Sequence, residues 1–392
     1  MKLNSIQFLR AVAALLVVYE HSMDMQMKYN TSWQQNFYHL NNFGCIGVDL
    51  FFVISGFIIM YIANNLRGPD KGWPFLEKRF YRINPVYYIA SLFYFAILLI
   101  QSWVFKGDTY SSLIKMIGSF FNTLLIVPVS GDIQVFKPLL SVGWTLCFEW
   151  LFYILFFSLI ICNAKNKIIL LPVFILLLVI IGMLLNTDDL RLQFITNPII
   201  LEFVLGIIVC QLYICSQKIP VIIGIICLII GLTSYGLLIR FGFGGVWYYL
   251  NTINGTQSLD RFLLWGIPSS SLVAGCVILE KNAYLTRLFN NKWIMLLGDA
   301  SYSIYLVHLI VLTLFTILYK QVGVFLPADA MIWLQVIIAV AIALVFYKLV
   351  EKPIMKRLYQ KTNNITAKEK SIIVIPEPPL ASITNRESMN IK

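Results

Sequence analysis

Long apolar runs that alternate with short polar segments dominate the chain. Ten of these runs reach about 20 residues, the length at which an α-helix crosses the apolar core of a bilayer. They predict an all-α polytopic membrane protein with spans near 5–24, 46–65, 84–105, 142–162, 168–186, 197–215, 219–240, 261–280, 301–319 and 331–350. The stretch 112–128 is shorter and amphipathic, so we interpret it as a re-entrant or interfacial helix, with an eleventh span as the alternative.

Composition supports a membrane protein and excludes other broad classes. Hydrophobic residues make up 59% of the 392 residues and charged residues only 12%, and the mean hydropathy is +0.79. A soluble globular protein carries about 25% charged residues. Soluble, fibrous and nucleic-acid-binding proteins are therefore excluded, and no nucleic acid is expected as a partner.

The positive charges predict how the chain sits in the membrane. If the N-terminus is cytoplasmic, 21 Lys and Arg residues fall on the cytoplasmic side and 8 on the outer side. Because cytoplasmic loops carry the excess of Lys and Arg, we expect both termini inside and a multi-pass protein of the plasma (inner) membrane. Residues 1–357 then form one membrane domain, and the polar residues 358–392 form a cytoplasmic tail of disordered composition.

The first predicted span carries two ionisable side chains, Arg10 and His21. Eleven steps of roughly 100° return a helix to within about 20° of its starting direction, so both residues lie on one stripe about 16 Å apart along the axis. Ionisable groups at membrane depth usually face a bundle interior or a watery cavity, and they mark functional sites. We therefore expect this pair to lie at the centre of the site.

Four further motifs carry polar residues in or beside predicted spans. They are 47–57 (GVDLFFVISGF), 78–87 (KRFYRINPVY), 144–153 (WTLCFEWLFY) and 298–308 (GDASYSIYLVH), and the last span closes with 350–353 (VEKP). Together with Arg10-x10-His21, and in this order, they resemble the acyltransferase-3 family of integral-membrane acyltransferases over about residues 5–355. Within that family, the chain most resembles the branch linked to exopolysaccharide production.

The resemblance implies a ten-helix enzyme that transfers an acyl group, usually acetyl, from a cytoplasmic donor such as acetyl-coenzyme A. The acceptor would be a hydroxyl group of an envelope or exported carbohydrate, and polysaccharide-synthesis machinery is a further candidate partner beside the lipid bilayer. Many members carry an additional soluble hydrolase-like domain. This chain ends after about 40 polar residues, so we expect any periplasmic partner that does the work of that domain to be a separate protein.

Three residues are candidates for catalysis. An imidazole such as His21 can take a proton from an attacking sugar hydroxyl, or carry the acyl group itself. Asp49, at the start of the second span, and Glu149, within the fourth, are at a depth from which either could reach and orient the ring of His21. The alternatives are a hydrogen-bonded core histidine for His21 and a helix-start carboxylate for Asp49.

Five residues are candidates for binding the acyl donor. Arg79 and Arg82 suit the phosphates of coenzyme A because a guanidinium offers planar, bidentate donors, and Arg10 would extend this basic path inward. The alternative for the arginine pair is an anchor to lipid headgroups. His308 and Tyr305, which share a helix face, are a second candidate for handling the acyl group, with an interhelical hydrogen bond as the alternative for His308.

Other functions remain open at this level. No metal is expected, because the histidines are only three, His21, His39 and His308, and none has the HxxxH spacing of a metal site. Ten helices with buried charges also suit a transporter or exporter of a glycan or small solute. A third alternative is a sensor or assembly factor of a polysaccharide-synthesis complex that has kept the fold without the activity.

Overall fold

The structure is a computed structural model that describes residues 3–29, 40, 42–105, 117–121, 138–185, 187, 189–215, 219–242, 245–246, 248–323, 326–358 and 360. Helices are the only regular elements in these ranges. In chain order they are α1 (Asn4–Tyr29), η2 (Phe43–Cys45), α2 (Ile46–Ala63), α3 (Pro69–Phe105), α5 (Gly143–Ile161), α6 (Lys167–Leu185), α7 (Leu190–Ile195), η3 (Pro198–Ile200), α8 (Leu201–Cys215), α9 (Val221–Phe241), α10 (Tyr249–Ile253), α11 (Ser258–Arg261), η4 (Phe262–Gly266), α12 (Ile267–Lys281), α13 (Thr286–Phe289), α14 (Lys292–Asp299), α15 (Ser301–Val322), α16 (Ala328–Phe346) and η5 (Tyr347–Glu351).

The ten predicted spans are confirmed. Within the described residues, ten helical segments are long and apolar enough to cross a membrane, and each coincides with one of the predicted apolar runs. Two of them join shorter pieces: α7, η3 and α8 cover Leu190–Cys215, and α11, η4 and α12 cover Ser258–Lys281. Of the amphipathic stretch 112–128 only a short helix at 117–121 is described, and the tail beyond residue 360 lies outside the described residues. The positions of the termini relative to the membrane stay a prediction.

The largest difference from expectation concerns α3. The apolar run predicts a span that starts near residue 84. The helix instead begins at Pro69 and continues through Pro74 and Pro85. One buried face, formed by Phe75, Ile83 and Val86, continues across the proline, and packing of this kind lets membrane helices keep an internal proline. Arg79 and Arg82 therefore lie inside a helix rather than before it.

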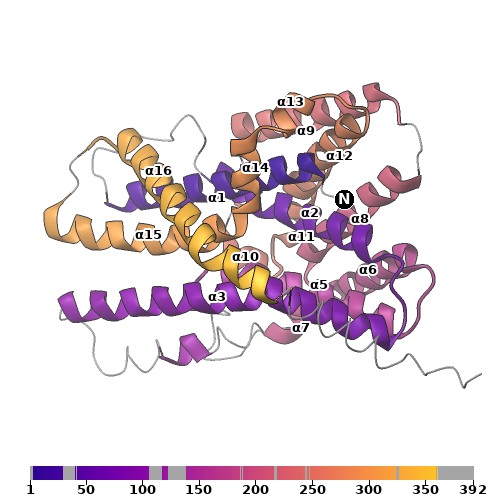
Figure 1. Ribbon diagram of the computed structural model, residues 1–392, viewed down its shortest axis with the longest axis horizontal. Helices are drawn as coiled ribbons and strands as arrows, with labels where there is room; N and C mark the ends of the chain where they lie inside the picture. The colour runs from indigo at the N-terminus through magenta and orange to yellow at the C-terminus, as the bar shows by residue number, and fades with distance from the viewer. Residues whose placement is uncertain are drawn as a thin grey trace, which may run out of the picture.

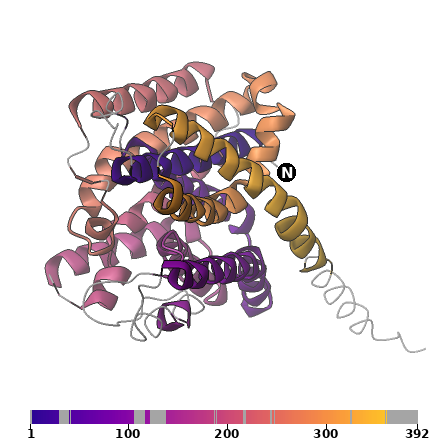
Figure 2. The ribbon, with the colours of Figure 1, turned by 90° about the vertical axis from the view of Figure 1, so that its left-hand side faces the viewer.

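Helix α1 lies at the centre of the bundle. It packs against α2, α14, α15 and α16, and Figure 1 shows it crossed by α16 and parallel to α15. In Figure 2 the indigo α1 lies inside the outline of the molecule, behind the gold α16. Close approach of η2 and α2 to α1 depends on small residues, because a Cβ on Gly44 of η2 would lie 2.1 Å from Leu16 O and one on Gly47 of α2 would lie 2.3 Å from Ala13 O. Such contacts are typical of helix packing in membranes.

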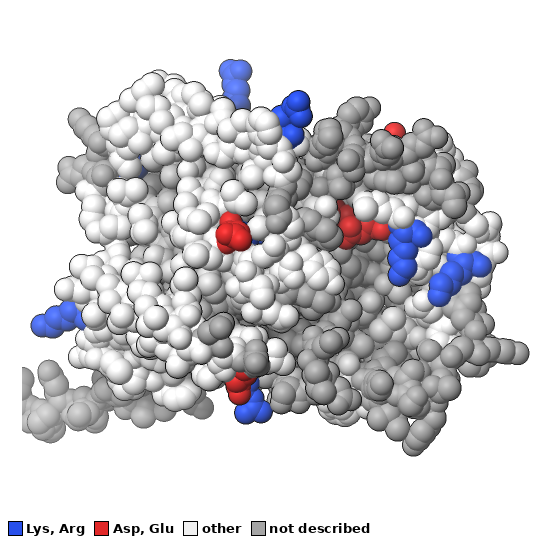
Figure 3. Space-filling model, turned by 180° about the vertical axis from the view of Figure 1, so that it is seen from behind, with Lys and Arg blue, Asp and Glu red and all other residues white. Residues whose placement is uncertain are grey.

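The periphery is apolar. Helices α6 and α9 are only 17% buried inside the molecule, and their exposed residues are predominantly Leu, Ile and Val. In the view from behind, the Lys, Arg, Asp and Glu side chains stand as isolated groups on a largely uncharged surface (Figure 3). An exterior of this kind suits lipid rather than water, and the chain is a multi-pass membrane protein.

Candidate active site

A row of three cavities passes through the bundle beside α1. The arginine cavity, of about 340 Å³, is lined by Arg10, Arg82, Asp299, Tyr302, Tyr347, Glu351, Lys352 and Met355. The middle cavity, of about 80 Å³, shares Arg10, Arg82 and Tyr302 with it. The histidine cavity, of about 310 Å³, contains His21 and shares Val48 and Tyr305 with the middle cavity. Because neighbouring cavities share lining residues, the three lie next to one another between the arginines and His21.

The structure brings two of the three predicted arginines together. Arg10 of α1 and Arg82 of α3 both line the arginine and middle cavities, and Arg10 lies within electrostatic reach of Arg82, Glu149 and Glu351. Two guanidinium groups that share a wall repel one another, so an anion bound between them is favoured. This arrangement suits a phosphate-bearing ligand.

Arg79 lies elsewhere. Its side chain is 9% exposed, and its guanidinium packs over the rings of Phe75 and Tyr153, 5.6 and 5.9 Å from their centroids. It lines none of the three cavities described above. Residues three apart on a helix differ by about 60° in direction, and that angle separates Arg79 from the cavity wall that Arg82 reaches.

His21 lies in the wall of the histidine cavity with one ring nitrogen already bonded. Its Nδ1 is 2.9 Å from the carbonyl oxygen of Val17. A carbonyl can only accept, so Nδ1 carries the proton and Nε2 keeps its lone pair in the neutral ring. This is the tautomer that a base or an acyl acceptor at Nε2 requires.

A second histidine lies directly beside it. The ring centroids of His21 and His308 are 5.0 Å apart. His308 on α15 is fully buried, donates Nδ1–H to Ile304 O at 3.1 Å, and its Nε2 has no hydrogen-bond partner. The ring of Tyr305, 6.1 Å away, lies on the same face as expected. A buried acceptor without a hydrogen-bond donor costs folding free energy. The unpaired Nε2 of His308 is therefore a candidate for a functional role.

The two predicted carboxylates do not reach His21. Both oxygens of Asp49 bind Arg261, at 2.8 Å each. Glu149 accepts hydrogen bonds from Ser55, at 3.3 Å, and from Tyr153, and it lines the middle cavity. Within the described residues neither acid contacts the imidazole, whose Nδ1 is oriented by the backbone of its own helix.

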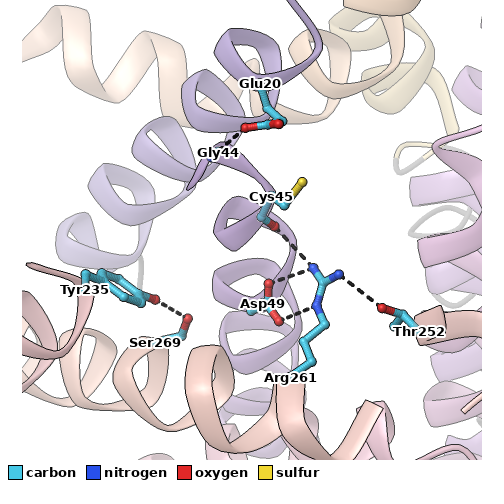
Figure 4. A network of polar contacts seen from close by, with 8 residues as sticks. All are labelled: Glu20, Gly44, Cys45, Asp49, Tyr235, Thr252, Arg261 and Ser269. Atoms are coloured by element: carbon cyan, nitrogen blue, oxygen red, sulfur yellow. Dashed lines mark hydrogen bonds and ion pairs between the residues drawn. The ribbon is translucent and has the colours of Figure 1, made fainter. Parts of the chain in front are cut away.

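Arg261 is a site residue that the sequence analysis did not select. It is 1% exposed and joins α11 to α2 through Asp49. The guanidinium of Arg261 also donates hydrogen bonds to Cys45 O and Thr252 Oγ1, at 3.3 Å each, as Figure 4 shows. The available signal was a pair of opposite charges, Asp49 and Arg261, at the same predicted depth in two apolar spans.

Two acids on α1 beside His21, Glu20 and Asp24, were also not predicted as site residues. Glu20 is buried and accepts a hydrogen bond from Gly44 N at 2.9 Å, which fixes the start of the α2 segment against α1 (Figure 4). Asp24, three residues after His21, is exposed and lines the histidine cavity. Their spacing from His21 on a helix was the available signal.

Tyr305 stands at the boundary between the middle and histidine cavities. Its hydroxyl is 2.8 Å from Thr145 Oγ1 and 3.2 Å from Val142 O, so the phenol is held in place by α5 and the turn before it.

Within the described ranges, no group of three or more His, Cys, Asp or Glu side chains is placed to hold a metal ion.

Comparison with known proteins identifies the family of this chain. The sequence model of the acyltransferase-3 family, described as an acyltransferase domain, matches residues 3–348. The exopolysaccharide production protein ExoZ of Rhizobium meliloti is 30% identical over 81% of this chain and 92% of its own. No solved structure gives a significant match.

Two O-acetyltransferases are also similar. OatA of Staphylococcus aureus is 25% identical over 82% of this chain and 55% of its own length. YrhL of Bacillus subtilis, described as a putative peptidoglycan O-acetyltransferase, is 26% identical over 81% of this chain and 52% of its own. These relatives favour an acyltransferase over the exporter that ten helices alone would equally allow.

Proposed function

From the premise that this chain belongs to the acyltransferase-3 family and is a membrane O-acyltransferase, we propose that it moves an acetyl group from acetyl-coenzyme A to a hydroxyl of an exported carbohydrate. The plasma membrane is the proposed location, with the arginine cavity toward the cytoplasm. The row of cavities from Arg10 and Arg82 to His21 is the observation that carries this proposal.

The arginine cavity holds the phosphates of the donor in this proposal. Arg10 and Arg82 supply bidentate donors, and Lys352 in the same wall adds a third cation. Asp299 and Glu351 lie in that wall as well. The pantetheine arm then extends along the middle cavity, and its thioester points to the boundary with the histidine cavity at Val48 and Tyr305.

His21 acts as the general base at the far end of this path. Its Nε2 takes the proton of the acceptor hydroxyl while the oxygen attacks the thioester carbonyl. The carbon–oxygen bond forms, the carbon–sulfur bond breaks, and the proton passes from the imidazolium to the departing thiolate. The products are an O-acetyl ester and free coenzyme A.

His308 supports that step as a positioning residue. Its unpaired Nε2 lies in a buried position beside the ring that becomes positively charged. A lone pair next to a developing imidazolium lowers the energy of the charged form, which is the part that an acid plays in a catalytic triad. Asp49 and Glu149 then act indirectly: Asp49 holds Arg261, and Glu149 balances charge in the middle cavity.

Label transfer tests the proposal. Membranes that contain equal amounts of folded wild type or His21→Ala protein receive acetyl-labelled acetyl-coenzyme A, and label is followed into extracted envelope carbohydrate. Label in the wild type with loss in the variant supports acyl transfer through His21. Label in both contradicts the role of His21, and free acetate without labelled carbohydrate contradicts the proposed acceptor.

A further inference from the structure

The histidine cavity has the size and walls of a small-ligand site. Its volume of about 310 Å³ lies at the lower end of the range for small-molecule pockets, roughly 300–1,000 Å³. The rings of Trp144 and Tyr248 contribute to its wall, and an aromatic face packs well against the apolar face of a sugar ring. A space of this size admits a sugar unit next to His21 and excludes a folded polymer.

The cation in this wall is not available to a ligand. Among the described lining residues Arg261 is the one Lys or Arg. Its Nε and one terminal nitrogen bind the two oxygens of Asp49, and the other terminal nitrogen bonds Thr252. Its guanidinium also packs 4.7 Å from the ring centroid of Trp265. The charge of Arg261 is therefore neutralised inside the protein, and it does not attract an anionic sugar.

One of the two acids in this wall, Asp24, has a carboxylate that a ligand can reach. Asp24 lies three residues after His21 on α1, so both side chains leave the helix on the same side. Among the described residues its carboxylate has no hydrogen-bond or ion-pair partner, whereas the neighbouring Glu20 is occupied by Gly44 N. A carboxylate accepts hydrogen bonds from hydroxyl groups and repels another carboxylate.

From these observations we propose that the histidine cavity is the acceptor site for an uncharged sugar unit and that Asp24 excludes anionic sugars from it. Asp24 binds a hydroxyl beside the one that His21 deprotonates, and the two groups orient the acceptor together. The inference rests on the proposed transfer to carbohydrate and adds the class of acceptor to it. Specificity then comes from a repulsive element as well as an attractive one.

Equilibrium binding tests this without turnover. Purified wild-type protein is titrated with fluorescent 4-methylumbelliferyl glycosides of glucose, galactose and mannose, and with the glucuronide and galacturonide. We expect at least one of the three neutral glycosides to bind. The glucuronide and the galacturonide should bind at least about tenfold more weakly than that glycoside, because two carboxylates would share a site of low dielectric constant.

Two variants locate the discrimination. Asp24→Asn removes the charge and keeps the shape, and it should bring uronide affinity to within about threefold of the neutral glycoside, since the repulsion is gone. Asp70→Asn makes the same charge change at an exposed site where Asp70 pairs with Lys71 at 3.6 Å, and discrimination should stay at the wild-type value.

Each contrary result is decisive. Equal binding of uronides and neutral glycosides to the wild type, no binding of any neutral glycoside, or unchanged discrimination in Asp24→Asn would overturn the inference. The proposed function fails separately: neutral glycosides that bind but never receive acetyl contradict acyl transfer and leave the binding site intact. Labelled uronides as the preferred product would keep the transfer and contradict the role of Asp24.

Discussion

The two ends of the cavity row differ in how their charges are arranged. At the arginine end, Arg10, Arg82, Lys352, Asp299 and Glu351 all reach one cavity wall. At the histidine end, Arg261 is bound to Asp49 inside the protein, and the two histidines donate their Nδ1–H groups to backbone carbonyls. The first end presents several cations and acids to one cavity, whereas the second pairs its arginine with an acid inside the protein and leaves the Nε2 atoms of the two histidines for chemistry.

This difference separates binding from catalysis along one helix. Arg10 and His21 share α1, so their distance of about 16 Å is fixed by helix geometry. Substitutions at one end should change donor binding, and substitutions at the other should change the chemical step or the fold. The following predictions test that separation.

The largest effect is expected for His21→Ala. Removal of a general base typically costs about 10²–10⁴-fold in rate, so kcat should fall by that factor. Affinity for coenzyme A should stay within about threefold, because the phosphate contacts of the arginine end are untouched. Transfer kinetics and equilibrium binding of coenzyme A measure the two quantities. A loss of donor binding equal to the loss of rate would contradict the separation.

Asp49→Ala should destabilise the fold. It leaves the guanidinium of Arg261 buried without its partner, and breaking a buried pair in this way typically costs about 3–5 kcal/mol. The readout is the midpoint of unfolding in detergent, with Asp70→Ala as the control because Asp70 is 72% exposed. Equal midpoints for the two variants would show that the Asp49–Arg261 pair is not structural.

Arg82→Ala should weaken donor binding. Loss of a charge-assisted hydrogen bond to phosphate costs about 1.5–3 kcal/mol, so KM for acetyl-coenzyme A should rise roughly 10- to 100-fold. Acetyl-pantetheine, which lacks the phosphates, should be used equally well by wild type and variant. Arg79→Ala is the matched control from the same helix, and its KM for acetyl-coenzyme A should change by less than the KM of Arg82→Ala. The opposite order would place the donor beside Arg79.

The smallest effect is expected at His308. His308→Ala should lower kcat about tenfold, since it removes a lone pair beside the developing imidazolium. His308→Gln keeps a hydrogen-bond acceptor and should recover most of that loss, with KM for acetyl-coenzyme A unchanged in both. Equal rates for Ala and Gln variants of matched thermal stability would assign His308 a packing role.

Much of the fold could be predicted because apolar runs of membrane length determine it directly. The ten spans follow from local composition, and the structure confirms them. The start of α3 could not be predicted in the same way. Whether a helix continues through Pro85 depends on packing of Phe75 and Ile83 against other helices, which the local sequence does not contain.

For the site as well, geometry within one helix could be predicted and contacts between helices could not. Arg10 and His21 could be placed on one stripe because one helix fixes their geometry, and both line the cavity row. The partners of Asp49 and Glu149 could not be predicted, since pairing between helices depends on rotation about each helix axis. The rotation of α2 about its axis determines which side chain Asp49 meets, and in the structure that is Arg261. The catalytic and binding roles of all these residues stay predictions.

In the proposed function, the acetyl group passes along the cavity row from a donor on one side of the membrane to an acceptor on the other. Sealed proteoliposomes with acetyl-labelled acetyl-coenzyme A outside and an acceptor glycoside enclosed inside test it directly. We expect label on the enclosed glycoside with wild-type protein and none with His21→Ala. Label that appears only when donor and acceptor share the same side of the membrane would contradict it.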